Sequence, residues 1–248
     1  MTRKFAPLTA LALIALTPAC AQGDVDATDK EAVQEIVRDY ILENPEIIEE
    51  ALIALSQKQA AAEEDAVRQA IDDNRDAIFN SDADYSVGPD DAEITVVEFF
   101  DYRCGYCKRS LDWTMALPDD YDGNVRVVFK EFPILTAESE KAALAALAAG
   151  EQGKYAEMHS ELMTLDNSTG FDADDIDAAA ERAGVDVDKM RADMGSVRLQ
   201  KVVADNKSLA RKLSVNGTPA FFVGDSFVSG ANEAGVNAAI REALAEVG

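Results

Sequence analysis

Residues that bind transition metals are scarce in this chain, which has three cysteines and one histidine among its 248 residues. Two of the cysteines, Cys104 and Cys107, form a single CxxC pair, and the third, Cys20, lies near the amino terminus. A structural zinc site needs four soft or borderline ligands, which this pair and His159 do not supply. The sequence therefore disfavours zinc, and His159 is expected to pack inside the protein or lie on a helix surface.

Basic residues are also few. The chain has 23 lysines and arginines against 47 aspartates and glutamates, which gives a formal net charge of −24. No basic region is large enough to neutralise the phosphates of a nucleic acid, so nucleic acid is not expected as a partner. The acidic residues are spread along amphipathic segments, which is typical of a soluble, self-repelling surface.

The apolar run near the amino terminus, Leu8 to Leu16, is too short to span a bilayer. It follows two basic residues and precedes Ala19-Cys20-Ala21, so residues 1–21 are predicted to be a cleaved secretory signal peptide. A second interpretation is a lipoprotein anchored to the membrane through Cys20, although Thr17-Pro18-Ala19 matches the usual lipobox poorly. Either way the protein leaves the cytoplasm, and an exported CxxC pair works where disulfides form and persist.

The CxxC pair lies where a strand is followed by a helix. Ile94 to Phe100 is an apolar, β-branched and aromatic run of buried-strand length, and a helix-compatible segment follows the cysteines. The first turn of a helix has free N–H groups and the positive end of the helix dipole, which favour a thiolate at Cys104. Cys107 lies one turn further, where it can resolve a mixed disulfide that Cys104 has formed.

Residues 22–82 have a helical pattern without a strand signal. Asn44-Pro45 is predicted to end one helix and begin a second, longer one. The second helix is thinly apolar and carries a weak coiled-coil spacing, so we expect an oligomerisation arm within residues 29–80. The alternative is a helix that lies on its own catalytic domain, or a flexible stalk.

The remaining chain, residues 83–248, predicts a mixed α/β domain. Val125 to Phe132 is the second clear strand, parallel to the first because a helix crosses between them. Lys130 on this strand is expected either to pair with Glu98 or to face solvent. Residues of about 138–213 hold only helical patterns. A hairpin around Gly224-Asp225 and a closing helix complete the domain.

Two segments about a hundred residues apart, VVEFFDYRCGYC and VNGTPAFFVG, resemble the DsbA-like periplasmic branch of the thioredoxin superfamily. The resemblance implies a thioredoxin-like fold with a helical insertion and a location in the periplasm. It implies a cis peptide bond at Thr218-Pro219, which with Gly105 and Tyr106 would contact substrate. It also makes Glu98, six positions before Cys104, a buried acid that relays a proton for Cys107. The alternative is a strand-end carboxylate that faces solvent.

The expected reaction is thiol–disulfide exchange on unfolded or misoxidised exported proteins, without a metal or organic cofactor. DsbA has a histidine before the second cysteine, where this chain has Tyr106, so we expect a less oxidising isomerase or reductase that is kept reduced by a membrane thiol reductase. The helical arm followed by CGYC also resembles the ScsC-like subgroup, which includes oligomeric isomerases. The alternatives are a DsbA-type oxidase served by a membrane oxidase, a Cu(I)-binding thiol protein, and a holdase that uses the arm.

Overall fold

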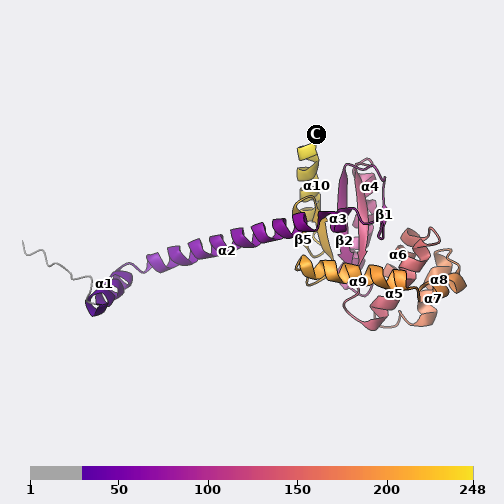
Figure 1. Cartoon of the computed structure of the whole chain (residues 1–248), viewed down its shortest axis with the longest axis horizontal. Helices are drawn as coiled ribbons and strands as arrows, with labels where there is room; N and C mark the ends of the chain where they lie inside the picture. Colours follow the sequence, from indigo (N-terminus) through magenta and orange to yellow (C-terminus); the bar gives the residue numbers. More distant parts are fainter. Residues whose placement is uncertain (1–29, 248) are drawn as a thin grey trace, which may run out of the picture. The chain divides into compact units, whose positions relative to one another are not determined.

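A computed structural model describes residues 30–247, so the predicted signal peptide and Cys20 lie outside the described residues. The chain divides into two units, Met1–Gln59 and Ala60–Gly248, each of which is described by itself. In the first unit, α1 (Lys30–Glu43) is followed by the beginning of α2 (Glu46–Asp73) (Figure 1). The Asn44 side-chain amide donates to the Tyr40 carbonyl oxygen at 2.8 Å and so ends α1, as Asn44-Pro45 predicted.

The two helices of the first unit leave most of their large apolar side chains exposed. α1 has no buried residue, and the only buried residue of α2, Ile71, belongs to the second unit. Nine large apolar side chains of the first unit are exposed by 37% to 66%: Val33, Ile36, Val37, Tyr40, Leu42, Ile48, Leu52, Ile53 and Leu55. Within the described residues, the first unit therefore does not bury its own apolar surface.

The second unit is built on a mixed five-stranded sheet in the order β1-β3-β2-β4-β5. The central strands β2 and β3 are parallel, as expected, and pair along seven residues from Ile94↔Val125 to Phe100↔Glu131. The outer strands and the hairpin pair antiparallel. The strands are β1 (Tyr85–Val87), β2 (Ile94–Phe100), β3 (Val125–Glu131), β4 (Ala220–Val223) and β5 (Ser226–Ser229).

Helices cover both faces of this sheet. Because side chains alternate along β2, successive residues of this strand face opposite layers of helices. Val96 and Phe100 belong to the core cluster that includes α4 (Gly105–Asp120) and α10 (Glu233–Val247). Val97 and Phe99 belong to a second cluster with α3 (Arg75–Phe79) and the end of α2. Glu98 therefore lies on the α4 face of the central strand.

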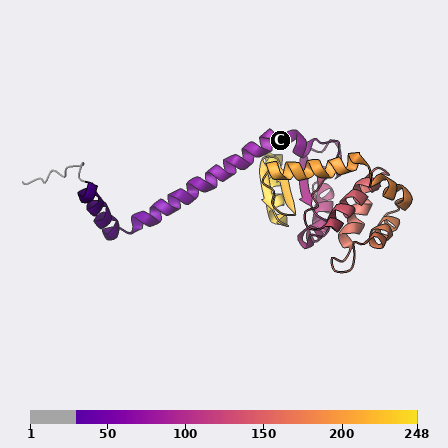
Figure 2. The same ribbon diagram turned by 60° about the horizontal axis from the view of Figure 1, so that its bottom comes forward.

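Five helices lie between β3 and β4, where the helical insertion was expected. Figures 1 and 2 show α5 to α8 gathered to one side of the sheet, with α9 running back along it. The insertion packs tightly on the sheet, since a Cβ on Gly150 would lie 2.1 Å from the Tyr85 ring. The helices are α5 (Ala137–Gly150), α6 (Tyr155–Thr164), α7 (Ala173–Arg182), α8 (Val187–Asp193) and α9 (Val197–Lys212).

Neither expectation for Lys130 was right. The side chain is buried with 1% exposure, and it pairs with Asp84 rather than with Glu98. Its ammonium group also donates to the Ala77 carbonyl oxygen at 2.7 Å, and the Asn206 amide donates to Asp84 at 2.9 Å. Because side chains alternate along β3, Lys130 faces away from the side on which Phe129 lies next to Glu98.

Candidate active site

Cys104 is the N-cap residue of α4. Its backbone is extended, with φ of −77° and ψ of 116°, and the helix begins at Gly105. Its sulfur lies 3.2 Å from the carbonyl oxygen of Thr218, so the β2–α4 junction and the loop before β4 meet at this atom. The residue is 8% exposed, while Cys107 one turn further is 1% exposed. Both thiols are free.

The two thiols differ strongly in acidity. A hydrogen bond from Cys107, aided by the Thr218 side chain and by the N–H groups of Cys107 and Tyr106, lowers the pKa of Cys104 to about 5, although burial acts in the opposite direction. Burial, and then the hydrogen bond to Cys104, raises the pKa of Cys107 far above its ordinary value. At neutral pH the pair therefore holds one thiolate at the helix start and one protonated thiol beneath it.

Glu98 lies under α4 in the middle of β2, with 2% exposure. Its neighbours across the sheet are Phe129 on β3 and Phe221 on β4. Burial raises the pKa of Glu98 to about 8, and the charge of Cys104 raises it further, while a hydrogen bond from Ser110 opposes the shift. The structure therefore places Glu98 in the core rather than at the solvent-facing end of a strand.

The three residues directly before Cys104, Asp101 to Arg103, each form hydrogen bonds to a different part of the unit. The carboxylate of Asp101 accepts from the backbone N–H groups of Arg103 at 2.8 Å, Ile134 at 2.9 Å and Leu135 at 3.0 Å. Arg103 donates to the carbonyl oxygen of Asn167, in the loop after α6, at 2.7 Å.

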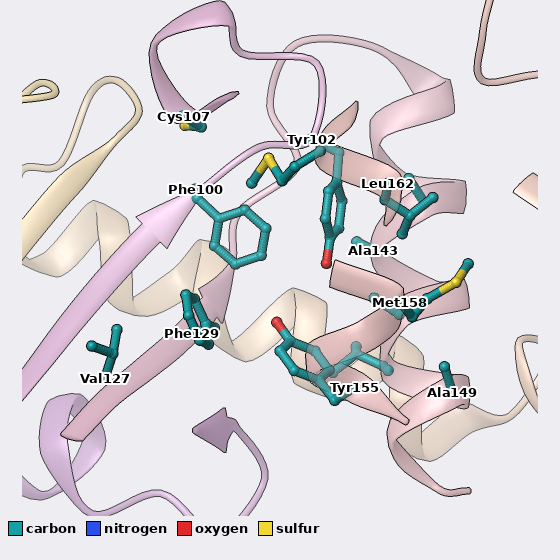
Figure 3. Packing of buried hydrophobic residues seen from close by; sticks show 14 of the residues in the cluster. Phe100, Tyr102, Cys107, Val127, Phe129, Ala143, Ala149, Tyr155, Met158 and Leu162 are labelled. Atoms are coloured by element: carbon teal, nitrogen blue, oxygen red, sulfur yellow. The ribbon is translucent and has the colours of Figure 1, made fainter. Parts of the chain in front are cut away.

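Tyr102 connects the same loop to β3 and to the insertion. Its hydroxyl donates to the Glu131 carboxylate at 3.1 Å and contacts His159 Nδ1 at 3.2 Å, while Tyr155 donates to the same carboxylate at 2.9 Å. Figure 3 shows Tyr102 and Tyr155 with their hydroxyls turned toward the space between them. His159 is 1% exposed, stacks on the Tyr155 ring and lies tilted against the Phe129 ring, so it has a packing role. Burial lowers the pKa of His159 to about 3.

The residues expected to contact substrate surround Cys104. The Thr218-Pro219 peptide bond is cis, and Thr218 contacts the Cys104 sulfur. Gly105 and Tyr106 are exposed on the first turn of α4, Tyr106 by 60%. The guanidinium of Arg109 lies 4.1 Å above the Tyr106 ring centroid. The structure thus brings all seven residues singled out from the sequence to one region.

Sequence reasoning missed Asp101, Ser110 and Glu131. Each lies directly beside a residue or motif that was recognised, but its importance depends on a contact that only the fold creates. The one available signal was polarity: each is a hydrogen-bonding side chain within or next to an otherwise apolar strand or helix face. Within residues 30–247, no group of three or more histidine, cysteine, aspartate or glutamate side chains is placed to hold a metal ion.

A thioredoxin-type sheet with an acidic thiol at a helix start, a second thiol one turn on and a cis-proline loop against them is the arrangement typical of thiol–disulfide oxidoreductases. The comparison with known families agrees with this class. Residues 95–236 match the DSBA-like thioredoxin domain, and the chain belongs to that family. Residues 29–62 match the copper resistance protein ScsC N-terminal domain.

Solved structures and curated sequences extend the comparison. A thioredoxin-like oxidoreductase from Silicibacter pomeroyi is 37% identical, covers 69% of this chain and 98% of its own, and superposes with a TM-score of 0.64. Proteus mirabilis ScsC in a transitional conformation is 31% identical and covers 90% of this chain and all of its own, with a TM-score of 0.64.

A curated relative, the Na(+)/H(+) antiporter NhaA 1 of Salinispora arenicola, is 34% identical over 167 residues, which is 66% of this chain and 25% of the antiporter. The chain thus spans about a quarter of the length of the first curated relatives it matches. Between residues 30 and 247, none of the helices combines the length and the apolar character needed to cross a membrane.

Proposed function

We propose that this chain is an exported protein disulfide isomerase or reductase that acts by thiol–disulfide exchange through Cys104 and Cys107. The observation that carries the proposal is the contrast between the two thiols: the pKa of Cys104 is lowered to about 5, while that of Cys107 is raised. A thiolate attacks a disulfide, and a protonated neighbour with a base beside it can then displace the product. Glu98 is that base.

The proposed reaction begins when the Cys104 thiolate attacks one sulfur of a substrate disulfide. The substrate S–S bond breaks, its second sulfur leaves as a thiolate, and a Cys104–substrate disulfide forms. In reduction, Cys107 gives its proton to Glu98 and attacks Cys104, which releases the substrate thiolate and leaves Cys104–Cys107 oxidised. In isomerisation, a second substrate thiolate attacks the mixed disulfide instead and regenerates the Cys104 thiolate without net electron transfer.

Glu98 suits both directions of this proton transfer. A group exchanges protons most efficiently when its pKa lies near the working pH, and the pKa of Glu98 is raised to about 8. The carboxyl group is buried, so bulk water does not compete for the proton, and it interacts electrostatically with both thiols. Glu98 is therefore assigned as the acid and base for Cys107.

The isomerase or reductase direction is favoured over oxidation by the acidity of Cys104. Its pKa of about 5 lies between about 7 in thioredoxin and about 3.5 in DsbA, so its thiolate can both attack and leave. Tyr106 stands where DsbA has a histidine. Such a protein works reduced and needs a membrane thiol reductase as partner. Its clients are misoxidised exported proteins, consistent with the predicted signal peptide and the similarity to ScsC.

Reactivation of a scrambled protein with several disulfides tests the direction. We expect the reduced chain to restore activity catalytically, and the variant Cys104→Ser to be inactive. Activity confined to reduced substrates, with none on scrambled ones, would contradict the isomerase assignment and favour an oxidase served by a membrane oxidase.

Residues 29–80, which include the described helices of the first unit, are proposed to mediate homo-oligomerisation. Its exposed apolar side chains and the match of residues 29–62 to the ScsC N-terminal domain support this assignment. Because Ile71, Ile78 and Phe79 belong to the core of the second unit, a deletion through residue 82 would damage that core. The sharper test replaces Ile48, Leu52 and Leu55 by serine in the full chain.

Light scattering then gives the mass of each variant in solution. We expect the triple variant to fall to the monomer mass and to keep dithiol reactivity, while Val197→Ser, at an exposed position outside this unit, leaves the mass unchanged. A parent chain that is already monomeric would reject the oligomerisation arm.

Cu(I) binding is the second candidate, because two neighbouring thiols suit a soft cation and the family matched by residues 29–62 is described as copper resistance. The variant Glu98→Gln separates the two functions. Exchange needs a base for Cys107, so its rate should fall, whereas binding of Cu(I) by the two sulfurs should hardly change.

A further inference from the structure

Ser110 contacts both residues that exchange the proton in the proposed reaction, through the carboxyl group of Glu98 and the backbone of Cys107. It is fully buried on α4, three residues after Cys107. Its hydroxyl oxygen is 3.2 Å from Glu98 Oε1 and 2.9 Å from the backbone carbonyl oxygen of Cys107. Within residues 30–247, no other side chain is hydrogen-bonded to the Glu98 carboxyl group.

A serine hydroxyl has one hydrogen, and this fixes how the two contacts can be made. The Cys107 carbonyl oxygen can only accept, so Ser110 must donate to it for that bond to exist. The contact with Glu98 is then a hydrogen bond only when Glu98 carries a proton and donates it to the hydroxyl oxygen. When Glu98 is ionised, the hydroxyl hydrogen must turn to the carboxylate and leave the Cys107 carbonyl oxygen.

We propose that Ser110 is a positioning residue whose hydroxyl hydrogen alternates between Glu98 and the Cys107 carbonyl oxygen with each proton transfer. The inference rests on the proposed function, in which Glu98 takes the proton of Cys107. In that step the Cys107 S–H bond breaks and a Glu98 O–H bond forms. The sulfur electron pair makes the Cys104–Cys107 bond, the substrate sulfur leaves with the electrons of the broken mixed disulfide, and Ser110 turns from the carboxylate to the carbonyl oxygen.

The surroundings of Glu98 make Ser110 the main group able to stabilise its ionised form. The titratable groups that interact with it are Cys104 at the N-cap of α4, Cys107 on α4 and Tyr102 on the β2–α4 loop. Each of these is neutral or becomes negative, and β3 and β4 place only Phe129 and Phe221 opposite it. Because no cation compensates the carboxylate among the described residues that interact with it, loss of the Ser110 hydroxyl should favour the protonated form.

The test compares Ser110→Ala and Ser110→Thr in the full-length reduced chain, with Ser139→Ala as control because Ser139 is an equally buried helical serine on α5. Carbon-13 NMR of labelled glutamate carboxyl groups follows the titration of Glu98. In Ser110→Ala we expect the midpoint to move to higher pH by about one pH unit, a tenfold change in the ionisation constant. Ser110→Thr keeps a hydroxyl and should restore the original midpoint, and Ser139→Ala should not move it.

A kinetic measurement distinguishes this inference from the proposed function. The rate at which Cys107 releases a preformed Cys104–peptide disulfide should reach its plateau about one pH unit higher in Ser110→Ala than in the parent. If Glu98→Gln slows release but Ser110→Ala leaves both the midpoint and the pH profile unchanged, the role of Ser110 is refuted and the exchange function stands. If the parent chain releases no peptide, the exchange function fails, and the role of Ser110 fails with it.

Discussion

The pKa of Cys104 should depend on the hydrogen bond that its thiolate receives from Cys107. The shift from 9.0 to about 5 corresponds to about 5 kcal/mol in favour of the thiolate, and the Cys107 side chain is its largest cause. A hydrogen bond to a charged group contributes about 1.5–3 kcal/mol, and a thiol is a weak donor. Cys107→Ala should therefore raise the pKa of Cys104 by about one pH unit, to about 6.

Cys107→Ser is the matched control, because a hydroxyl can donate to the thiolate in place of the thiol. In this variant the pKa of Cys104 should stay near 5. The measurement is the ultraviolet absorbance of the thiolate across pH, checked by the pH dependence of alkylation by iodoacetamide. Equal pKa values in the two variants would refute the role of Cys107 as donor, and a parent value near that of free cysteine would refute the thiolate altogether.

Three further predictions concern buried polar groups. The pKa of Glu98 in the folded state, about 8, lies above its ordinary 4.5. The stability that its protonated form provides is therefore complete below about pH 4.5 and is lost as the pH rises through 8. In urea unfolding of the reduced chain, Glu98→Gln should gain about 3 kcal/mol on the parent between pH 4.5 and pH 7. Lys130→Met should lower the free energy of unfolding by about 3–5 kcal/mol because it leaves the Asp84 carboxylate buried without its cation, and adding Asp84→Leu should recover much of the loss. Tyr102→Phe should cost about 1–2 kcal/mol in the same assay, because Glu131 loses one of its two tyrosine donors; an unchanged unfolding midpoint would contradict that bond.

The parts of the fold that the sequence predicted correctly have local signals. The run from Ile94 to Phe100 is apolar on both faces, which indicates a strand covered on both sides, and its bounds agree with β2. The turn at Gly224-Asp225 carries the residues that a two-residue hairpin needs, and Gly224 has a φ of 55°. The dithiol was found because two cysteines at this spacing before a helix have few other uses.

The parts that were missed depend on contacts between segments far apart in the chain. Lys130 was expected at the surface or beside Glu98 because a lysine is seldom buried, and its partner Asp84 lies 46 residues earlier in a segment that reads as a linker. Lys130 follows three consecutive apolar residues, Val127 to Phe129, in a strand that is buried almost throughout. A charge at the end of such a run is stable in the core only when it is paired, which indicates a buried partner for Lys130.

The contacts before Cys104 explain how the helical insertion bears on the chemistry at the dithiol. Asp101, Tyr102 and Arg103 each form hydrogen bonds to a different part of the unit. Asp101 bonds the loop after β3, Tyr102 bonds Glu131 on β3 and His159 on α6, and Arg103 bonds the loop after α6. A thiolate is stabilised by hydrogen-bond donors only if they are held at the right distance, and the loop that holds Cys104 is fixed by these bonds rather than by the sheet alone. The insertion is thus part of the structure that fixes the acidity of Cys104, because Tyr102 and Arg103 are both hydrogen-bonded to residues of the insertion.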